Sequence, residues 1–123
     1  MGGEVNRARK RLNVPYPIMY APPGHPHERE FNCIQRGHQN SLEVAPAFLI
    51  CLLVAGLRFP TAAALAGVVF LAARYSYFKG YCTGDPAARL RGISQLWVLA
   101  AFAVLGMIAA WAAELMLVPT GGK

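Results

Sequence analysis

The sequence predicts an all-α integral membrane protein, a helical bundle with three transmembrane helices. Hydrophobic residues make up 55% of the 123 residues and charged residues only 15%, which is unusual for a soluble domain of this size. The stretch 96–113 has no charged side chain and is long enough to cross a bilayer as a helix. Two further apolar stretches precede it, which brings the expected number of crossings to three.

Residues 1–30 are predicted to form a basic and Pro-rich cytosolic segment, and residues 31–123 a transmembrane helical domain. The segment opens with the basic cluster NRARKR and continues as VPYPIMYAPPGHPHE. The five prolines of this connector exclude a regular helix, so we expect an ordered loop. No cleavable signal sequence is expected, because the first thirty residues lack an apolar run.

The first crossing is predicted from about Phe31 to near Gly56, with a kink at Pro46, which removes a helical hydrogen bond. The turn GLRFPT is short, so the second crossing, from Pro60 to about Tyr81, should be an antiparallel neighbour of the first. Its TAAALAG stretch allows close helix approach.

The third crossing is predicted from Gly92 to about Leu117, after a loop, CTGDPAARLRG, with Gly-Asp-Pro turn chemistry. Three alternating crossings place ten of the twelve basic residues on one side, which the positive-inside rule assigns to the cytosol. The ten are Arg7, Arg9, Lys10, Arg11, Arg29, Arg36, Arg74, Lys79, Arg89 and Arg91. So small a bundle would struggle to enclose its polar groups, so we expect it to be oligomeric.

The formal charge of +6 would also suit nucleic-acid binding, but the basic residues lack an accompanying soluble fold, so no nucleic-acid partner is expected. Cys33, Cys51 and Cys82 contain no CxxC pair and are expected to be unpaired thiols. His25 and His27 lie in the Pro-rich loop without suitable further ligands, so no metal site is expected.

The first crossing begins with a polar face. On a helix, Arg36, Asn40 and Glu43 stand at about 0°, 40° and −20°, whereas His38 points away at about 200°. A purely structural alternative is a buried Arg–Glu pair that fastens neighbouring helices. Ionisable groups at membrane depth are costly unless partnered, which also makes this face a functional candidate.

A second polar face is predicted on the next crossing, where Arg74, Tyr77 and Tyr81 stand at about 0°, −60° and −20°. An aromatic belt at the membrane surface is the alternative, and it suits Tyr75 and Phe78 well. Together the two faces would suit a small flexible ligand with several carboxylates, because Arg binds carboxylates bidentately. Glu43 would bind a ligand amine.

The motifs FNCIQRGHQNSLEVAPAF and RYSYFKGYCTGDPAARLRG, preceded by ARKRLNVPYPIMY, resemble the MAPEG family of membrane-associated proteins in eicosanoid and glutathione metabolism. The resemblance covers nearly the whole chain from about Arg7 and is greatest to the microsomal glutathione S-transferase type three branch. It implies four crossings and a homotrimer with glutathione between subunits. Relative to that pattern, this chain is expected to lack the first transmembrane helix.

Glutathione, with two carboxylates, an amine and a thiol, is the co-substrate that the resemblance implies. The residues that match its binding positions are Arg36, Asn40, Glu43, Arg74, Tyr77 and Tyr81, together with Arg9 from a neighbouring subunit and His38. Arg89 matches the arginine that activates the thiol. A guanidinium would favour the nucleophilic thiolate, because a free thiol has a pKa of about 8.5.

The expected function is that of a glutathione transferase, with peroxidase activity on lipid hydroperoxides, conjugating lipophilic electrophiles from the membrane lipid. The resemblance places it in leukotriene metabolism, in the endoplasmic reticulum or the mitochondrial outer membrane. Two alternatives are a non-catalytic, lipid-presenting or regulatory membrane partner of the same family, and an inactive truncated product. Retention of the binding set favours the enzyme.

Overall fold

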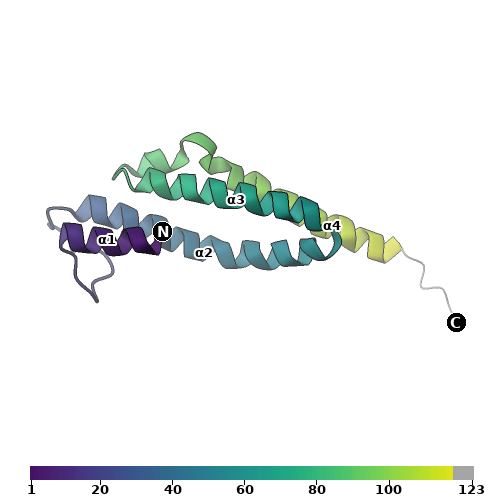
Figure 1. The fold of residues 1–123 in the computed structure, drawn as a ribbon, viewed down its shortest axis with the longest axis horizontal. Helices are drawn as coiled ribbons and strands as arrows, with labels where there is room; N and C mark the ends of the chain where they lie inside the picture. The colour runs from purple at the N-terminus through teal and green to yellow at the C-terminus, as the bar shows by residue number, and fades with distance from the viewer. Residues whose placement is uncertain (118–123) are drawn as a thin grey trace.

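The computed structural model describes residues 1–117, which form helices and connecting loops without a β-strand (Figure 1). The elements are α1 (Gly2–Leu12), α2 (Glu28–Arg58), α3 (Pro60–Tyr81), the 3₁₀ turns η1 (Pro86–Leu90) and η2 (Gly92–Gln95), and α4 (Leu96–Leu117). The predicted all-α class is therefore confirmed.

Three helical segments are long and apolar enough to cross a membrane. They are Glu28–Arg58, Pro60–Tyr81 and Gly92–Leu117, and an 18-residue stretch within each has a mean hydropathy of 1.8, 1.3 and 2.2, respectively. A 22-residue helix spans about 33 Å at about 1.5 Å per residue, which matches a bilayer core. The predicted bounds agree closely, except that α2 begins three residues earlier and the last span starts with a 3₁₀ turn.

The long helices α2 and α3 run antiparallel and pack against each other, and α4 packs against both (Figure 1). Only Phe59 separates α2 from α3, and Pro60 occupies the first turn of α3, where a missing N–H costs nothing. Small residues allow the close approach that the sequence predicts: a Cβ at Gly67 would lie 3.3 Å from Leu52 Cδ2. Helix α2 continues through Pro46 without interruption.

At the end of the bundle remote from α1, an ion pair joins α2 to α4. Arg58 Nε lies 2.9 Å from Glu114 Oε2, and both side chains are about half exposed. A guanidinium and a carboxylate at the end of two apolar spans satisfy each other near the membrane boundary, which favours keeping these helix ends together.

The basic cluster lies in a helix, α1, that its sequence pattern does not predict. Within α1, Val5, Ala8 and Leu12 are buried and pack with Phe31 of α2. Their spacing of three and four residues places them on one helical face, and the helix ends at Asn13 in the left-handed conformation. The Pro-rich residues 13–27 contain no helix, as predicted.

Candidate functional site

The predicted polar face of α2 is present, and its two charged residues contact each other. Arg36 Nη1 lies 2.7 Å from Glu43 Oε1, and the Asn40 amide nitrogen lies 3.5 Å from the other Glu43 oxygen. The Arg36 and Glu43 side chains are 45% and 44% exposed. The pair is therefore within one helix and half exposed, unlike the buried interhelical pair of the structural alternative. Ion pairs this exposed are weak, so both groups are available to ligand charges.

Arg74 is the buried cation of the site. Its side chain comes from α3, is 3% exposed, and donates from Nη2 to Asn40 Oδ1 at 2.6 Å and to Ser41 Oγ at 3.2 Å. Ser41 in turn donates to the Gly37 carbonyl at 3.0 Å. Arg74 Nε is buried without a hydrogen-bond partner, and none of the ion pairs within residues 1–117 includes Arg74. A buried guanidinium without a carboxylate is a strong site for a ligand anion.

Aromatic rings extend the site along α3 to Arg89. The Arg74 guanidinium carbon lies 4.4 Å from the centre of the Tyr77 ring, whose centre is 5.3 Å from that of Tyr81. The guanidinium carbon of Arg89 lies 5.6 Å from the Tyr81 ring centre. Arg89, in η1, also donates to the Pro86 carbonyl. The structure thus connects the candidate catalytic arginine to the candidate binding residues.

Two glycines allow this arrangement by close approach. A Cβ at Gly37 of α2 would lie 2.9 Å from Tyr81 Cβ, so only glycine lets the Tyr81 side chain pack there. A Cβ at Gly80 would lie 2.6 Å from Arg89 Cα, so glycine lets η1 rest directly on α3. Both distances are below ordinary van der Waals separation, and in the second case the obstacle is backbone.

Arg36 and Tyr81 border a cavity of about 670 Å³, which Pro86 of η1 also lines. Cys33 and Arg29, about one and two turns N-terminal to Arg36 on α2, line it too. The cavity wall therefore has two guanidinium groups and a phenol. Arg74 is buried and does not line this cavity.

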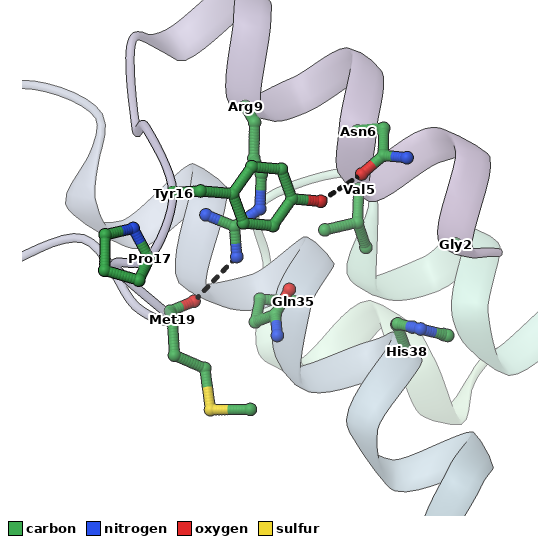
Figure 2. Close-up of a pocket in the computed structure, with 9 residues that line it drawn as sticks. All are labelled: Gly2, Val5, Asn6, Arg9, Tyr16, Pro17, Met19, Gln35 and His38. Atoms are coloured by element: carbon green, nitrogen blue, oxygen red, sulfur yellow. Dashed lines mark hydrogen bonds between the residues drawn. The ribbon is translucent and has the colours of Figure 1, made fainter.

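Arg9 and His38 lie elsewhere. Both line a different cavity, of about 360 Å³, between α1, α2 and the Pro-rich connector (Figure 2). His38 thus faces away from Arg36, as the helical angle predicts. Neither Arg9 nor His38 forms a hydrogen bond with Arg74 within one chain.

The Arg9 guanidinium is largely engaged by its own connector. It is 8% exposed and lies 4.4 Å from the Tyr16 ring centre. Its terminal nitrogens donate to three backbone carbonyls, those of Val14 at 3.3 Å, Ile18 at 2.5 Å and Met19 at 3.5 Å. Arg9 therefore holds the Pro-rich connector against α1, a role that the sequence does not reveal.

Sequence reasoning misses two residues of the site. Ser41 follows Asn40 by one position, so periodicity gave no reason to place it beside Arg74. Trp97 is the second residue of α4, at a helix end where a tryptophan usually indicates an interfacial anchor. Its ring centre lies 5.6 Å from the Arg74 guanidinium carbon.

Trp97 also lines an apolar cavity of about 250 Å³ between α2, α3 and α4. The other lining residues are Val44, Ala47, Phe48, Cys51, Phe70, Ala101 and Leu105. Phe48 and Phe70 stack with ring centres 3.7 Å apart. Trp97 thus lies beside the buried Arg74 guanidinium and also lines an apolar cavity among the spanning helices.

Comparisons with known proteins agree with this architecture. A sequence profile of the MAPEG family matches residues 1–113. Leukotriene C4 synthase of Bos taurus is 39% identical over 110 residues, which cover 86% of this chain and 69% of that protein. Microsomal glutathione S-transferase 2 of Mus musculus is 35% identical over 108 residues, which cover 84% of this chain and 69% of that protein.

Neither relative is of the type three branch, so that finer assignment is not confirmed. The family-level expectation is confirmed: with the profile match over residues 1–113 and three helices able to cross a bilayer, the chain is an integral membrane protein of the MAPEG family.

Proposed function

We propose that this chain is a membrane-bound glutathione transferase that conjugates glutathione to lipophilic electrophiles. The observation that carries the proposal is Arg74, a guanidinium that is 3% exposed, oriented by Asn40 and Ser41 and without a carboxylate partner in residues 1–117. A ligand carboxylate would supply the missing counter-charge. The names of the relatives, leukotriene C4 synthase and microsomal glutathione S-transferase 2, support glutathione as that ligand.

The charged groups of the site match those of glutathione. Arg36 and Arg74 would bind the two carboxylates, and Glu43 would bind the amine after leaving Arg36. Asn40 would orient Arg74, and the hydroxyl groups of Tyr77 and Tyr81 would donate to the bound peptide.

We propose a homotrimer in which glutathione lies between subunits. Arg9 and His38 lie in a cavity apart from Arg74, and His38 is about 200° round α2 from Arg36. A ligand that contacts both sets must therefore lie between two copies. One copy would contribute the Arg36–Arg74 side and its neighbour the Arg9–His38 side.

Arg89 is the proposed catalytic residue, and its role is to hold the glutathione sulfur as thiolate. The thiolate attacks an electrophilic carbon, a C–S bond forms, and the bond to the leaving oxygen or halide breaks with its electron pair. With a lipid hydroperoxide, the thiolate attacks the distal oxygen and the O–O bond breaks. The sulfur becomes a sulfenic acid, and the alkoxide takes a proton from solvent and leaves as the alcohol. The thiol of a second glutathione then attacks the sulfenic sulfur, so that an S–S bond forms and water leaves.

The apolar cavity beside Trp97 would admit the lipophilic co-substrate from the bilayer. Because Trp97 lies 5.6 Å from Arg74, this route ends beside the bound tripeptide. We further propose that the basic end of the bundle faces the cytosol, in the endoplasmic reticulum or the mitochondrial outer membrane.

The test is glutathione binding by calorimetry and turnover with a chloronitrobenzene and a lipid hydroperoxide, using purified chain in detergent. Arg89→Ala should retain glutathione binding and lose at least about tenfold in kcat, because a lost charge-assisted interaction is worth about 1.5–3 kcal/mol. Arg91→Ala is the matched control, since that side chain is exposed and pairs with Asp85 at 3.6 Å. If the unmodified chain neither binds nor consumes glutathione, the proposal fails.

The second candidate is a non-catalytic, lipid-presenting partner, which the apolar cavity also favours. It predicts saturable binding of a fatty acid analogue without glutathione turnover. The buried, unpaired Arg74 favours the transferase, because presentation of a lipid needs no buried cation.

A further inference from the structure

The cavity between α1, α2 and the connector contains several buried polar atoms without partners. Arg9 Nε, Gln35 Oε1 and His38 Nδ1 are all out of contact with solvent and make no hydrogen bond in the structure. All three side chains line the same cavity of about 360 Å³. Gln35 is 6% exposed, and Figure 2 shows its carboxamide between the Arg9 guanidinium and the His38 ring.

Gln35 is a poor choice for packing alone. A buried amide without a partner destabilises the fold, whereas an apolar side chain of the same length would fill this position without that penalty. Gln35 lies between Arg9 and His38, which also carry polar atoms without hydrogen-bond partners, so a single bound ligand could pair with all three. We propose that Gln35 is a further binding residue, which accepts a hydrogen bond from a peptide ligand held between Arg9 and His38.

The chemistry of the three atoms selects the class of ligand. Arg9 Nε–H is a donor and needs a carbonyl or carboxylate oxygen, whereas Gln35 Oε1 is an acceptor and needs an N–H. The His38 ring nitrogen serves either need according to its tautomer. A simple anion would satisfy Arg9 but would place acceptor against acceptor at Gln35. A peptide with a free carboxylate supplies both an oxygen and an N–H within a few ångströms.

The unpaired Nε–H of Arg9 is consistent with a ligand bound in this cavity. Its terminal nitrogens are directed to the carbonyls of the connector, with Ile18 the shortest at 2.5 Å, while Nε remains unused. The connector thus fixes the guanidinium in place and leaves the buried Nε–H donor unused. The inference rests on the proposed function, in that the peptide is taken to be glutathione and the cavity to be the neighbouring subunit's contribution.

The experiment is a calorimetric titration of glutathione into the full chain and three variants, together with thermal unfolding without ligand. Gln35→Leu and Gln35→Met remove the acceptor and keep the volume. The matched control is Gln39→Leu, which changes the same residue type one turn later on α2 at a position that lines neither polar cavity. We expect both Gln35 variants to raise the glutathione Kd about tenfold, with an unfolding temperature equal to or above that of the unmodified chain. Gln39→Leu should stay within about twofold.

If the Gln35 variants unfold at an equal or higher temperature but bind glutathione more weakly, Gln35 contacts the ligand. A residue that only stabilised the fold would instead lower the unfolding temperature when it is replaced. If the unmodified chain binds glutathione and both Gln35 variants bind it equally well, ordered water satisfies the cavity and the inference falls, while the proposed function stands. If the unmodified chain binds no glutathione, both fall together.

Discussion

The Arg74 guanidinium of α3 donates to the Asn40 side-chain oxygen of α2 at 2.6 Å, and this hydrogen bond joins the two predicted polar faces. Asn40 satisfies the cation without neutralising it, because a carboxamide carries no charge. The positive charge of Arg74 therefore stays available although the side chain is 3% exposed. The neutral Asn40 side chain thus orients Arg74 and leaves its positive charge available to an anionic ligand.

The first prediction concerns Arg74→Lys, which keeps the charge but removes the fork of donors. Lysine cannot donate to Asn40 and Ser41 while also presenting a bidentate edge to a carboxylate. We expect the glutathione Kd to rise at least about tenfold, as measured by calorimetry. Arg58→Lys, at the opposite end of the bundle, should leave the Kd unchanged. Equal affinities for the Arg74 variant and the unmodified chain would remove Arg74 from the site.

The second prediction concerns Ser41, which accepts from Arg74 at 3.2 Å and donates to the Gly37 carbonyl at 3.0 Å. Ser41→Ala removes the acceptor and frees the guanidinium to turn. We expect the KM for glutathione to rise about three- to tenfold, since a hydrogen bond to a charged group is worth about 1.5–3 kcal/mol and Asn40 retains part of it.

Ser41→Thr restores a hydroxyl at the same position and serves as the control. It should return KM to within about twofold of the unmodified value, with kcat for the generic electrophile little changed in both variants. A loss in Ser41→Ala that Ser41→Thr does not restore would point to packing as the cause.

Sequence patterns predict what depends on helical period and apolar length. The spacing of Arg36, Asn40 and Glu43 places them on one face, and the structure shows Arg36 and Glu43 in contact. The opposite direction of His38 follows from the same period. The bounds of α3, Pro60–Tyr81, match the predicted crossing, because a proline starts that helix and its apolar length then has to span a bilayer.

What the sequence does not predict depends on contacts between distant segments. The basic cluster forms α1 because Val5, Ala8 and Leu12 pack against Phe31 of α2. The burial of these apolar side chains stabilises the helix despite the repulsion among the basic residues of 7–11. Trp97 lies beside Arg74 only because the η1–η2 loop returns α4 to α3. No local pattern encodes such a pairing.

The third prediction is a pH dependence at Cys82, which follows α3 and packs beside the buried cluster of α1. Burial raises the pKa of the Cys82 thiol, and the nearby charge of Lys79 opposes this only in part. Since the thiolate is the nucleophile, a raised pKa means less thiolate at neutral pH. Alkylation of Cys82 by maleimide, followed by mass spectrometry, should therefore be slower at pH 7.5 than that of N-acetylcysteine. The rate should continue to rise at pH values where the small thiol has levelled off.

A variant that undocks α1 tests the cause. Ala8 is 3% exposed on the buried face, so Ala8→Glu should expose Cys82 and bring its alkylation close to that of the small thiol. Gly3→Ala, where a Cβ meets nothing within 4 Å, should not. Fast alkylation of Cys82 in the unmodified chain would contradict the docking of α1.

The last prediction tests how Arg89 is positioned. Gly80→Ala would place a Cβ 2.6 Å from Arg89 Cα, and backbone at that distance has to move rather than rotate away. We expect η1 to shift from α3 and the Arg89 guanidinium to leave Tyr81, which lies 5.6 Å away in the native arrangement. Because Arg89 is proposed to hold the thiolate rather than the peptide, kcat should fall about tenfold or more while the glutathione Kd changes little. Gly106→Ala in α4 is the control, since its Cβ meets nothing within 4 Å and alanine gains about 1 kcal/mol of helix propensity. It should keep full activity and unfold at an equal or higher temperature, and an unchanged kcat in Gly80→Ala would show that turnover does not depend on where η1 holds Arg89.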